Sequence, residues 1–324
     1  MREALFVKQH SEKWRSYEQM HAASPDELAQ RFTDITSDLS YARTFYPKSK
    51  TTVYLNGLAA TLHQAIYRRK RERANRFLHF WKTELPLLFY IRRRQLGYAF
   101  IIFMAAACIG VLSAKFDDTF VRLIMGDDYV NMTNENISKG DPFGVYKRES
   151  SFSMFVRIAA NNVQVSFVVF VLGLFAGLGT ISGLLHNGVM LGAFEYYFFS
   201  KGLGMQSVLV IWIHGTLEIA AIIIAGGAGL VLGNGILFPG TYTRLQSFRR
   251  AAAEGTKIIV GLVPVFLTAA FFEGYVTRHT EMPVWLSAGI LAGSLAFIIW
   301  YVVIYPLRLH RIHNLNKHGF QGRI

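Results

Sequence analysis

A histidine and two glutamates lie in parts of the sequence that are otherwise apolar. His214 and Glu218 belong to "IWIHGTLEIAAIIIAGGAGL" (residues 211–230), and Glu273 belongs to "AAFFEGYVT" (residues 269–277). Residues four apart on a helix face the same way, so His214 and Glu218 are expected to share a proton or a hydrogen bond. Because an ionisable side chain near the centre of a bilayer costs about 2.5 to 3.5 kcal/mol, these residues need a structural or functional explanation.

Two interpretations of this polar site remain open. In the first, the side chains are packed dry and hydrogen-bond one helix to another. In the second, they line a water-accessible path and handle protons, cations or a small solute. The intramembrane polar site predicted in this way consists of His214, Glu218, Glu273, Asn161, Asn162 and Asn187.

We predict no catalytic residue, no metal site and no cofactor. The zinc-protease motif H-E-x-x-H places two histidines on one helix face, whereas "HGTLE" supplies one histidine and one carboxylate. A third ligand would have to come from Glu273 or His186, and the sequence does not establish that either is near. The sequence also contains no serine nucleophile elbow, glycine-rich phosphate loop or cysteine cluster. We therefore expect a protein that is not an enzyme.

The composition indicates an integral membrane protein. Hydrophobic residues make up 52% of the 324 residues and charged residues 17%, whereas about a quarter of a soluble chain is charged. The apolar residues form long blocks after residue 96, so we predict an all-α polytopic fold with about six transmembrane helices. The segment at 186–203 is short for a crossing, and it either crosses fully or is re-entrant. The predicted spans are 97–115, 160–182, 186–203, 206–233, 257–277 and 284–306.

The charge distribution predicts the domains and the orientation. Residues 1–95 form a helical domain that ends in an interfacial helix, residues 96–306 form the membrane bundle, and residues 307–324 form a basic tail. Basic clusters flank the spans on one side, whereas the predicted external loop at 116–156 leans acidic. By the positive-inside rule, both termini are cytoplasmic in a multi-pass protein of the cytoplasmic (inner) membrane. The net charge of +13 therefore implies membrane lipids as partners rather than nucleic acid.

Glycines recur four residues apart in the apolar blocks, which is typical of closely packed transmembrane helices. The ordinary explanation of this spacing is helix packing within the bundle, and the more specific explanation is a homodimer interface. The glycines assigned to helix packing are Gly173, Gly177, Gly188, Gly192, Gly215, Gly229 and Gly233.

Three segments together resemble the stage II sporulation protein M family. They are "RIAANNVQVSFVVFVLGLFAGLGTISGLLHNGVMLG", "HGTLEIAAIIIAGGAGLVLG" and "AAFFEGYVT". They carry the family's Asn-Asn pair, glycine-rich helix, Asn-Gly turn, His-Gly-x-x-Glu element and closing Glu-Gly, and the resemblance is strong over residues 150–280. The matching residues are Asn161, Asn162, Gly173, Gly177, Asn187, Gly188, His214, Gly215, Glu218, Glu273 and Gly274.

The resemblance implies a bacterial or archaeal membrane protein. In the sporulating representative, the family organises peptidoglycan-degrading enzymes and has no known catalysis of its own. The amino-terminal domain and the basic tail depart from that representative, so this chain resembles the broader branch that is often encoded beside an AAA-type ATPase of the MoxR group. We predict a non-enzymatic scaffold that recruits such an ATPase or cell-wall hydrolases. The alternative is a membrane transporter or channel for a proton, cation or small solute.

Overall fold

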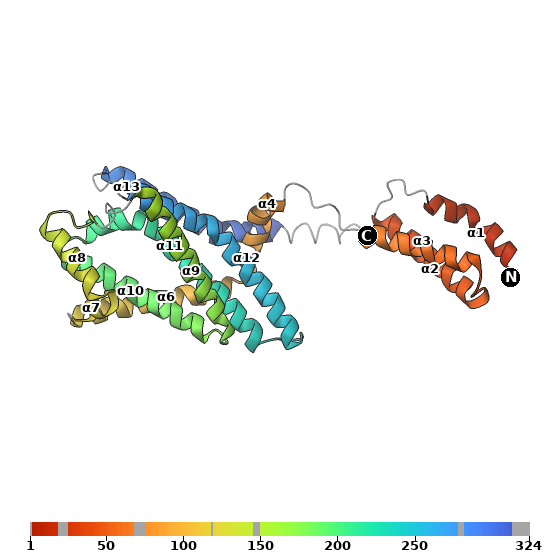
Figure 1. Cartoon of the computed structure of the whole chain (residues 1–324), viewed down its shortest axis with the longest axis horizontal. Coiled ribbons are helices and arrows are strands. Elements are labelled where there is room, and N and C mark those ends of the chain that lie inside the picture. The colour runs from red at the N-terminus through yellow and green to blue at the C-terminus, as the bar shows by residue number, and fades with distance from the viewer. Residues whose placement is uncertain are drawn as a thin grey trace. The chain divides into compact units, whose positions relative to one another are not determined.

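The computed structural model describes residues 2–18, 25–67, 76–117, 119–144, 150–277 and 282–312. Within these residues every regular element is a helix, which confirms the predicted all-α class (Figure 1). The chain divides into two compact units, Met1–Arg76 and Phe77–Ile324. Most of the basic run at 68–76 and the end of the basic tail, from residue 313 on, lie outside the described ranges.

Three helices build the amino-terminal unit: α1 (Glu3–Glu18), α2 (Pro25–Phe45) and α3 (Lys50–Tyr67). Apolar residues three and four apart give each helix one apolar face, and these faces pack together because burial removes them from water. The core residues include Phe6, Trp14, Ile35, Leu55 and Leu62. The unit therefore has a hydrophobic core of its own.

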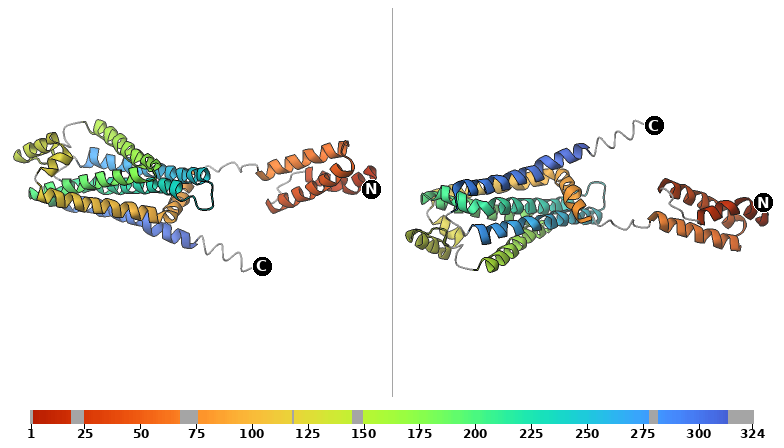
Figure 2. Two further views of the ribbon diagram at one scale, coloured as in Figure 1. Left: turned by 90° about the horizontal axis from the view of Figure 1, so that it is seen from below. Right: turned by 90° about the horizontal axis from the view of Figure 1, so that it is seen from above.

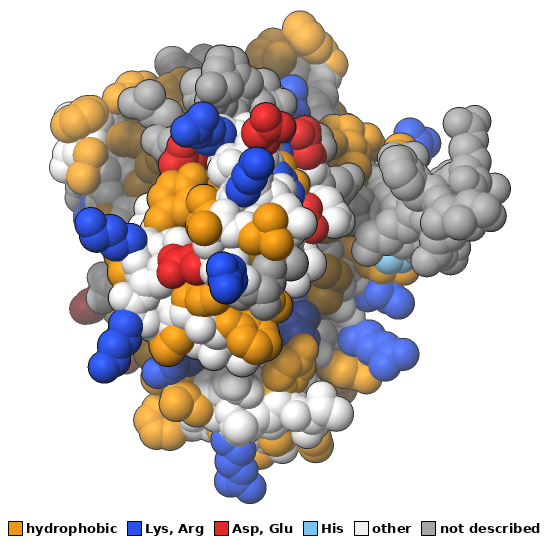
Figure 3. Space-filling model, turned by 90° about the vertical axis from the view of Figure 1, so that its right-hand side faces the viewer, with side chains coloured by type: hydrophobic (Ala, Val, Ile, Leu, Met, Phe, Trp, Pro, Cys, Tyr) orange, Lys and Arg blue, Asp and Glu red, His pale blue; other side chains and the backbone are white. Residues whose placement is uncertain are grey.

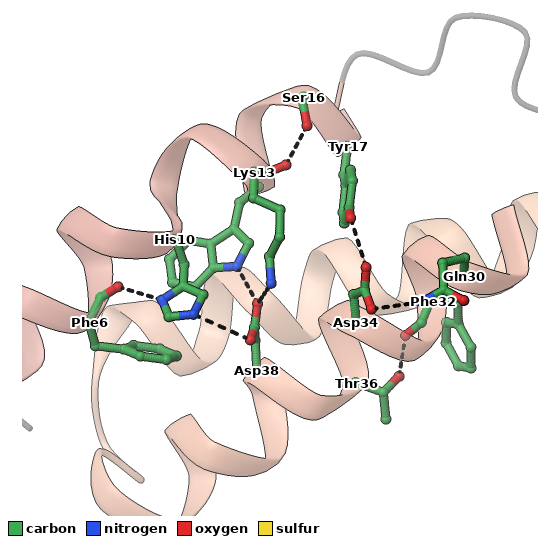
Figure 4. Close-up of polar contacts among 11 residues, drawn as sticks. Phe6, His10, Lys13, Ser16, Tyr17, Gln30, Phe32, Asp34, Thr36 and Asp38 are labelled. Carbon is green, nitrogen blue, oxygen red and sulfur yellow. Dashed lines mark hydrogen bonds and ion pairs between the residues drawn. The ribbon is translucent and has the colours of Figure 1, made fainter. Parts of the chain in front are cut away.

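Two aspartates of α2 connect it to α1 (Figure 4). Asp38 accepts a hydrogen bond from the Trp14 indole N–H at 2.8 Å and pairs with the Lys13 ammonium at 2.6 Å. Asp34 accepts the Tyr17 hydroxyl at 2.8 Å. Burial, together with the hydrogen bond to Asp34, raises the pKa of Tyr17. These charge-assisted bonds fix α1 on α2.

The predicted interfacial helix falls in the second compact unit, which starts at Phe77. It comprises α4 (Arg76–His79), the π-helical η1 (Phe80–Glu84) and α5 (Leu85–Ile91), and it runs across one end of the bundle (Figure 2). Lys257 pairs with Glu84 at 3.0 Å, and Arg92 pairs with Glu254. These ion pairs join the interfacial helix to α12 (Arg244–Phe271).

Elongated helices run beside one another in the membrane unit (Figures 1 and 2). Two short helices, α7 and α8, lie at the end of the bundle opposite α4 and α5. They show that part of the predicted 116–156 loop is helical, and the hydroxyl of Tyr197 donates to Asn134 of α8 at 2.7 Å. The remaining elements are α6 (Arg93–Phe116), α7 (Phe120–Met125), α8 (Asp127–Ser138), α9 (Ser151–Val171), η3 (Leu172–Leu174), α10 (Leu178–Ser200), α11 (Gly204–Leu237), η4 (Phe272–Val276), α13 (Val284–Ile298) and η5 (Ile299–Ile304).

Five helices in the described ranges are long and apolar enough to cross a membrane. They are Arg93–Phe116, Ser151–Leu174, Gly204–Leu237, Arg244–Val276 and Val284–Ile312. The sixth predicted span, at 186–203, falls in α10, which starts eight residues earlier than predicted. This helix has 23 residues, enough for a crossing at about 1.5 Å per residue, but it is not among the helices apolar enough to be identified as spans. A sixth crossing stays a prediction.

Glycines allow two close helix contacts along α10 and α11. A Cβ on Gly173 would collide with the backbone of Gly229, and one on Gly233 would collide with the backbone of Gly177. Gly177 also has a φ of 83°, a left-handed conformation that suits glycine at the start of α10. In these places η3 and the turn before α10 lie directly on α11.

Gly188 and Gly192 of α10 make the second close contact, which is with α6. A Cβ on Gly188 would overlap Ala106 and the Phe103 carbonyl of α6, and one on Gly192 would overlap the Ala107 carbonyl. By contrast, Gly215 of α11 has no atom within 4 Å of where its Cβ would stand. Close helix approach therefore explains the spacing at several positions but not at Gly215.

Basic side chains gather where the sequence predicts the cytoplasmic face. Arg92 pairs with Glu254 of α12, and Glu254 also pairs with Arg250 of the same helix. Figure 3 shows Lys and Arg side chains at many places on the surface that faces the viewer, which includes the amino-terminal unit. This distribution is the one expected from a net charge of +13.

Candidate functional site

The structure brings His214, Glu218 and Glu273 together. His214 and Glu218 stand one turn apart on α11, and Glu273 comes from η4 at the end of α12. The imidazole Nε2 of His214 lies 3.7 Å from a carboxylate oxygen of Glu273. One potential ligand atom from each of the three residues lies within 4.8 Å of the other two. The cluster therefore joins α11 to η4 through residues that are far apart in sequence.

A π-helical turn positions Glu273. Residues Phe272–Val276 form η4, and the amide of Thr277 closes the turn by donating to the Phe272 carbonyl at 2.8 Å. π-turns inside α-helices are rare and are frequent at functional sites, because the extra residue re-aims the side chains around it. Here the widened turn carries both Glu273 and Thr277.

Thr277 is a site residue that the sequence reasoning missed. Its hydroxyl oxygen lies 3.1 Å from Nδ1 of His214 and donates to the Phe272 carbonyl at 3.2 Å. The side chains of His214 and Thr277 are both buried. The sequence could have indicated this residue, because Thr277 lies four residues after Glu273 and residues four apart share a helix face.

Helix α9 supplies the opposite wall of a cavity of about 420 Å³. Asn162 is only 4% exposed, and its side chain interacts with the Glu218 carboxylate. The hydroxyl of Ser166, one turn further along α9, is buried without a hydrogen-bond partner among the described residues. The cavity is lined by Arg157, Ile158, Asn161, Asn162, His214, Glu218 and Glu273.

Asn187 is not brought to this cluster. Its amide donates to the Gly183 carbonyl at 2.8 Å within α10. It lines a separate cavity of about 400 Å³ between α9 and α10, which Asn161 also lines. Glu195 of α10 is bound elsewhere as well, because its carboxylate accepts the Trp212 indole N–H at 2.7 Å.

The cavity lies in the half of the bundle that is nearer to α7 and α8. Helix α11 starts at Gly204, so at about 1.5 Å per residue His214 is roughly 15 Å from that end. Further along the same helix, residues 221–229 are all buried. The tightly packed glycine contacts with η3 follow there, at Gly229 and Gly233.

The arrangement is suited to holding a positive charge. Two carboxylates and an imidazole face one another in a largely buried space, where unpaired charge is costly. They line a cavity instead of filling the space between the helices. A proton, a cation or the polar groups of a small solute would complete the interactions of these side chains.

Two family models match the chain. Residues 99–278, more than half of its length, are similar to stage II sporulation protein M. Residues 4–68 are similar to a domain of unknown function, DUF8413. No curated protein and no solved structure matches the chain. The first match contains every residue of the predicted polar site, and the second covers the helices of the amino-terminal unit.

Proposed function

We propose that this chain, which belongs to the stage II sporulation protein M family, transports a cation or small polar solute through its membrane bundle. The observation that supports this function is the cavity at His214, Glu218 and Glu273. Dry packing, in which each polar group has a protein partner, is what a purely structural role requires. The cavity, with Asn162, His214 and the two carboxylates on its wall, favours an occupant.

The position of the cavity gives the proposed route. We assign the α7–α8 end to the outer side of the cytoplasmic membrane, because the basic clusters mark the other end as cytoplasmic. The solute enters from that outer side and reaches Glu218. Passage onward requires η3 and α10 to move against α11. Gly173 and Gly229 meet at this contact. Because glycine has no side chain that could interlock, the two helices can slide past each other there with few atoms displaced.

Flux through sealed vesicles tests this function. Full-length protein is reconstituted into liposomes, and the uptake of protons, K⁺ and divalent cations is followed with enclosed reporters. We expect uptake of at least one ion, and we expect Glu218→Gln and Glu273→Gln to abolish it. Glu195→Gln is the matched control, because Glu195 is a carboxylate of the bundle outside the cavity. Folded protein that conducts none of these ions, or variants that all conduct equally, would contradict transport.

A scaffold role is the second candidate, and the separate amino-terminal unit supports it. That unit has its own core and its own family match, as an added docking module would. We propose an AAA-type ATPase of the MoxR group as its partner on the cytoplasmic side. Cell-wall hydrolases are the proposed partners of α7 and α8, and a homodimer is the proposed assembly. Neither candidate function requires the chain to be an enzyme.

Cross-linking in the native host tests the scaffold role. Photoreactive residues at exposed positions of α2 or α8 are expected to capture an ATPase or a hydrolase, respectively, that mass spectrometry identifies. Deleting residues 1–76 should remove the first cross-link while ion flux in liposomes stays unchanged. Cross-links to lipid alone at both places would argue against a scaffold.

A further inference from the structure

We infer that the membrane unit binds the phosphate headgroup of an anionic phospholipid at the end of the bundle that carries α4 and α5. Two segments supply the binding residues: residues 77–95, with the interfacial helix and the start of α6, and residues 282–312, with the last span. This inference goes beyond the proposed function and does not require transport. The binding residues form a basic cluster of exposed side chains, which are Lys82, Arg93, Arg94, Arg308 and Arg311.

Two tyrosines hold the last span on the interfacial helix (Figure 2). The Tyr301 hydroxyl donates to the Trp81 carbonyl at 2.7 Å, and the Tyr305 hydroxyl donates to the Lys82 carbonyl at 2.8 Å. Arg308 stands three residues after Tyr305, so the two share a helix face. These bonds therefore bring Lys82 and Arg308 to the same part of the surface, although they are far apart in sequence.

The ring of Tyr90 connects Arg93 to the same span. His310 stacks on this ring with centroids 3.9 Å apart, and the Arg93 guanidinium lies 4.4 Å from the ring centroid. Nη1 of Arg93 also donates to the Tyr90 carbonyl at 3.0 Å. This bond uses one of the five N–H donors of an arginine. Two contacts thus hold in place the planar group that binds phosphate oxygens in pairs.

The cluster carries more positive charge than its surroundings balance. The two segments contain one acidic residue in the sequence, Glu84, and it pairs with Lys257 of α12. Glu254 of α12, which also lies at this end, pairs with Arg92. Each carboxylate therefore has a cation outside the cluster. Basic residues at the level of the headgroups attract anionic lipid in this situation.

Apolar side chains beside the cluster indicate a lipid rather than a free phosphate ion. Trp300, Val303 and Leu307 are exposed on the last span, just before its basic residues, and Phe77 and Leu78 are exposed on the interfacial helix. In a bilayer, side chains of this kind contact acyl chains, while the basic residues beyond them extend to the headgroups. A free phosphate ion would use the cations alone.

Binding of phosphatidylglycerol to purified protein is the test. Full-length protein in detergent is titrated with phosphatidylglycerol or phosphatidylcholine, and native mass spectrometry counts the lipids that stay bound. We expect one tightly bound phosphatidylglycerol, in preference to phosphatidylcholine. The double variant Arg93→Gln, Arg308→Gln should bind it about 10-fold or more weakly. The double variant Arg244→Gln, Arg249→Gln is the matched control. It removes the same charge from exposed positions of α12 and should bind like the wild type.

The outcomes separate a built lipid site from general attraction between charges. Equal binding of the two lipids, or equal losses of affinity in the two double variants, overturns the site. Displacement of phosphatidylglycerol by inorganic phosphate at the same phosphate concentration overturns the lipid as its occupant.

A measurement on the wild type alone does not depend on whether a variant folds. In nanodiscs of phosphatidylcholine, added phosphatidylglycerol should slow hydrogen exchange in residues 77–94. Unchanged exchange there contradicts the site. None of these measurements uses ion flux, so the lipid site and the transport function stand or fall separately.

Discussion

Thr277 and His214 form a buried hydrogen bond of 3.1 Å that links the π-turn after α12 to the first half of α11. This bond orients the imidazole, and it leaves the opposite ring nitrogen facing Glu273. Thr277 directly follows η4, so its position beside His214 depends on the path of that π-helical turn.

Replacing Thr277 with valine should disturb the site without changing its shape. The Thr277→Val side chain has nearly the same volume but cannot hydrogen-bond to Nδ1, so a buried ring nitrogen loses this partner at a cost of about 1 to 3 kcal/mol. We expect a lower free energy of unfolding in detergent. Thr277→Ser keeps the hydroxyl and is the control. Equal free energies of unfolding for the valine and serine variants would show that the bond does not stabilise the fold.

A larger residue at Gly229 should destabilise the bundle. A Cβ there would overlap the side chain of Thr180 and the Val169 carbonyl, and overpacking of this kind costs about 1 to 3 kcal/mol. We expect Gly229→Val to lower the thermal unfolding temperature in detergent. Gly215→Ala in the same helix is the control, because a Cβ there meets nothing within 4 Å. A larger loss of stability in Gly215→Ala than in Gly229→Val would contradict the packing described for α11.

The amino-terminal unit should lose stability in acid through Glu3. Hydrogen bonds from Ser49 and Thr51 lower the pKa of Glu3 in the folded chain. A carboxyl with a lowered folded pKa adds stability above its unfolded pKa of about 4.3 and loses it as pH falls through the folded value. We expect hydrogen exchange in α1, corrected for intrinsic rates, to rise as pH drops below about 4. Glu3→Gln should flatten this dependence, and an unchanged pH profile in that variant would refute the assignment.

Helix α10 should cross the membrane although it is not among the five helices that are long and apolar enough by their composition. It spans 23 residues, or about 35 Å at 1.5 Å per residue, and the hydrocarbon core is about 30 Å thick. Its first turn packs on α11 at Gly177, and its last turns contact α8 through Tyr197 and Asn134. The two ends of α10 therefore lie at opposite ends of the bundle.

Cysteine labelling in cells measures this crossing. Cys108 is the one cysteine of the chain, so Cys108→Ser gives a cysteine-free background. We expect Lys201→Cys to react with a membrane-impermeant maleimide from outside the cell, and Phe175→Cys, in the exposed turn before α10, to react only after permeabilisation. Labelling of both positions from the same side would show that α10 is re-entrant.

Local sequence was enough to predict the membrane helices and half of the site. Hydropathy over about 20 residues reports whether a segment can leave water, and this depends on composition and not on neighbours. His214 and Glu218 share a face because helix geometry alone places residues i and i+4 together. The capacity of α10 to cross was uncertain for the same reason, because polar residues such as Asn187 and Glu195 lower its hydropathy.

Only the tertiary structure decided which polar residues meet. Glu273 reaches His214 because a π-turn redirects it and because α12 packs against α11, and neither fact is written in residue spacing. Asn187 has the same chemistry as Asn162, yet it bonds within α10 and lies in another cavity. The interfacial helix joined the bundle through Glu84 and Arg92, whose partners are more than 160 residues away in sequence. Contacts between distant segments depend on the packing of whole helices, and no local pattern encodes them.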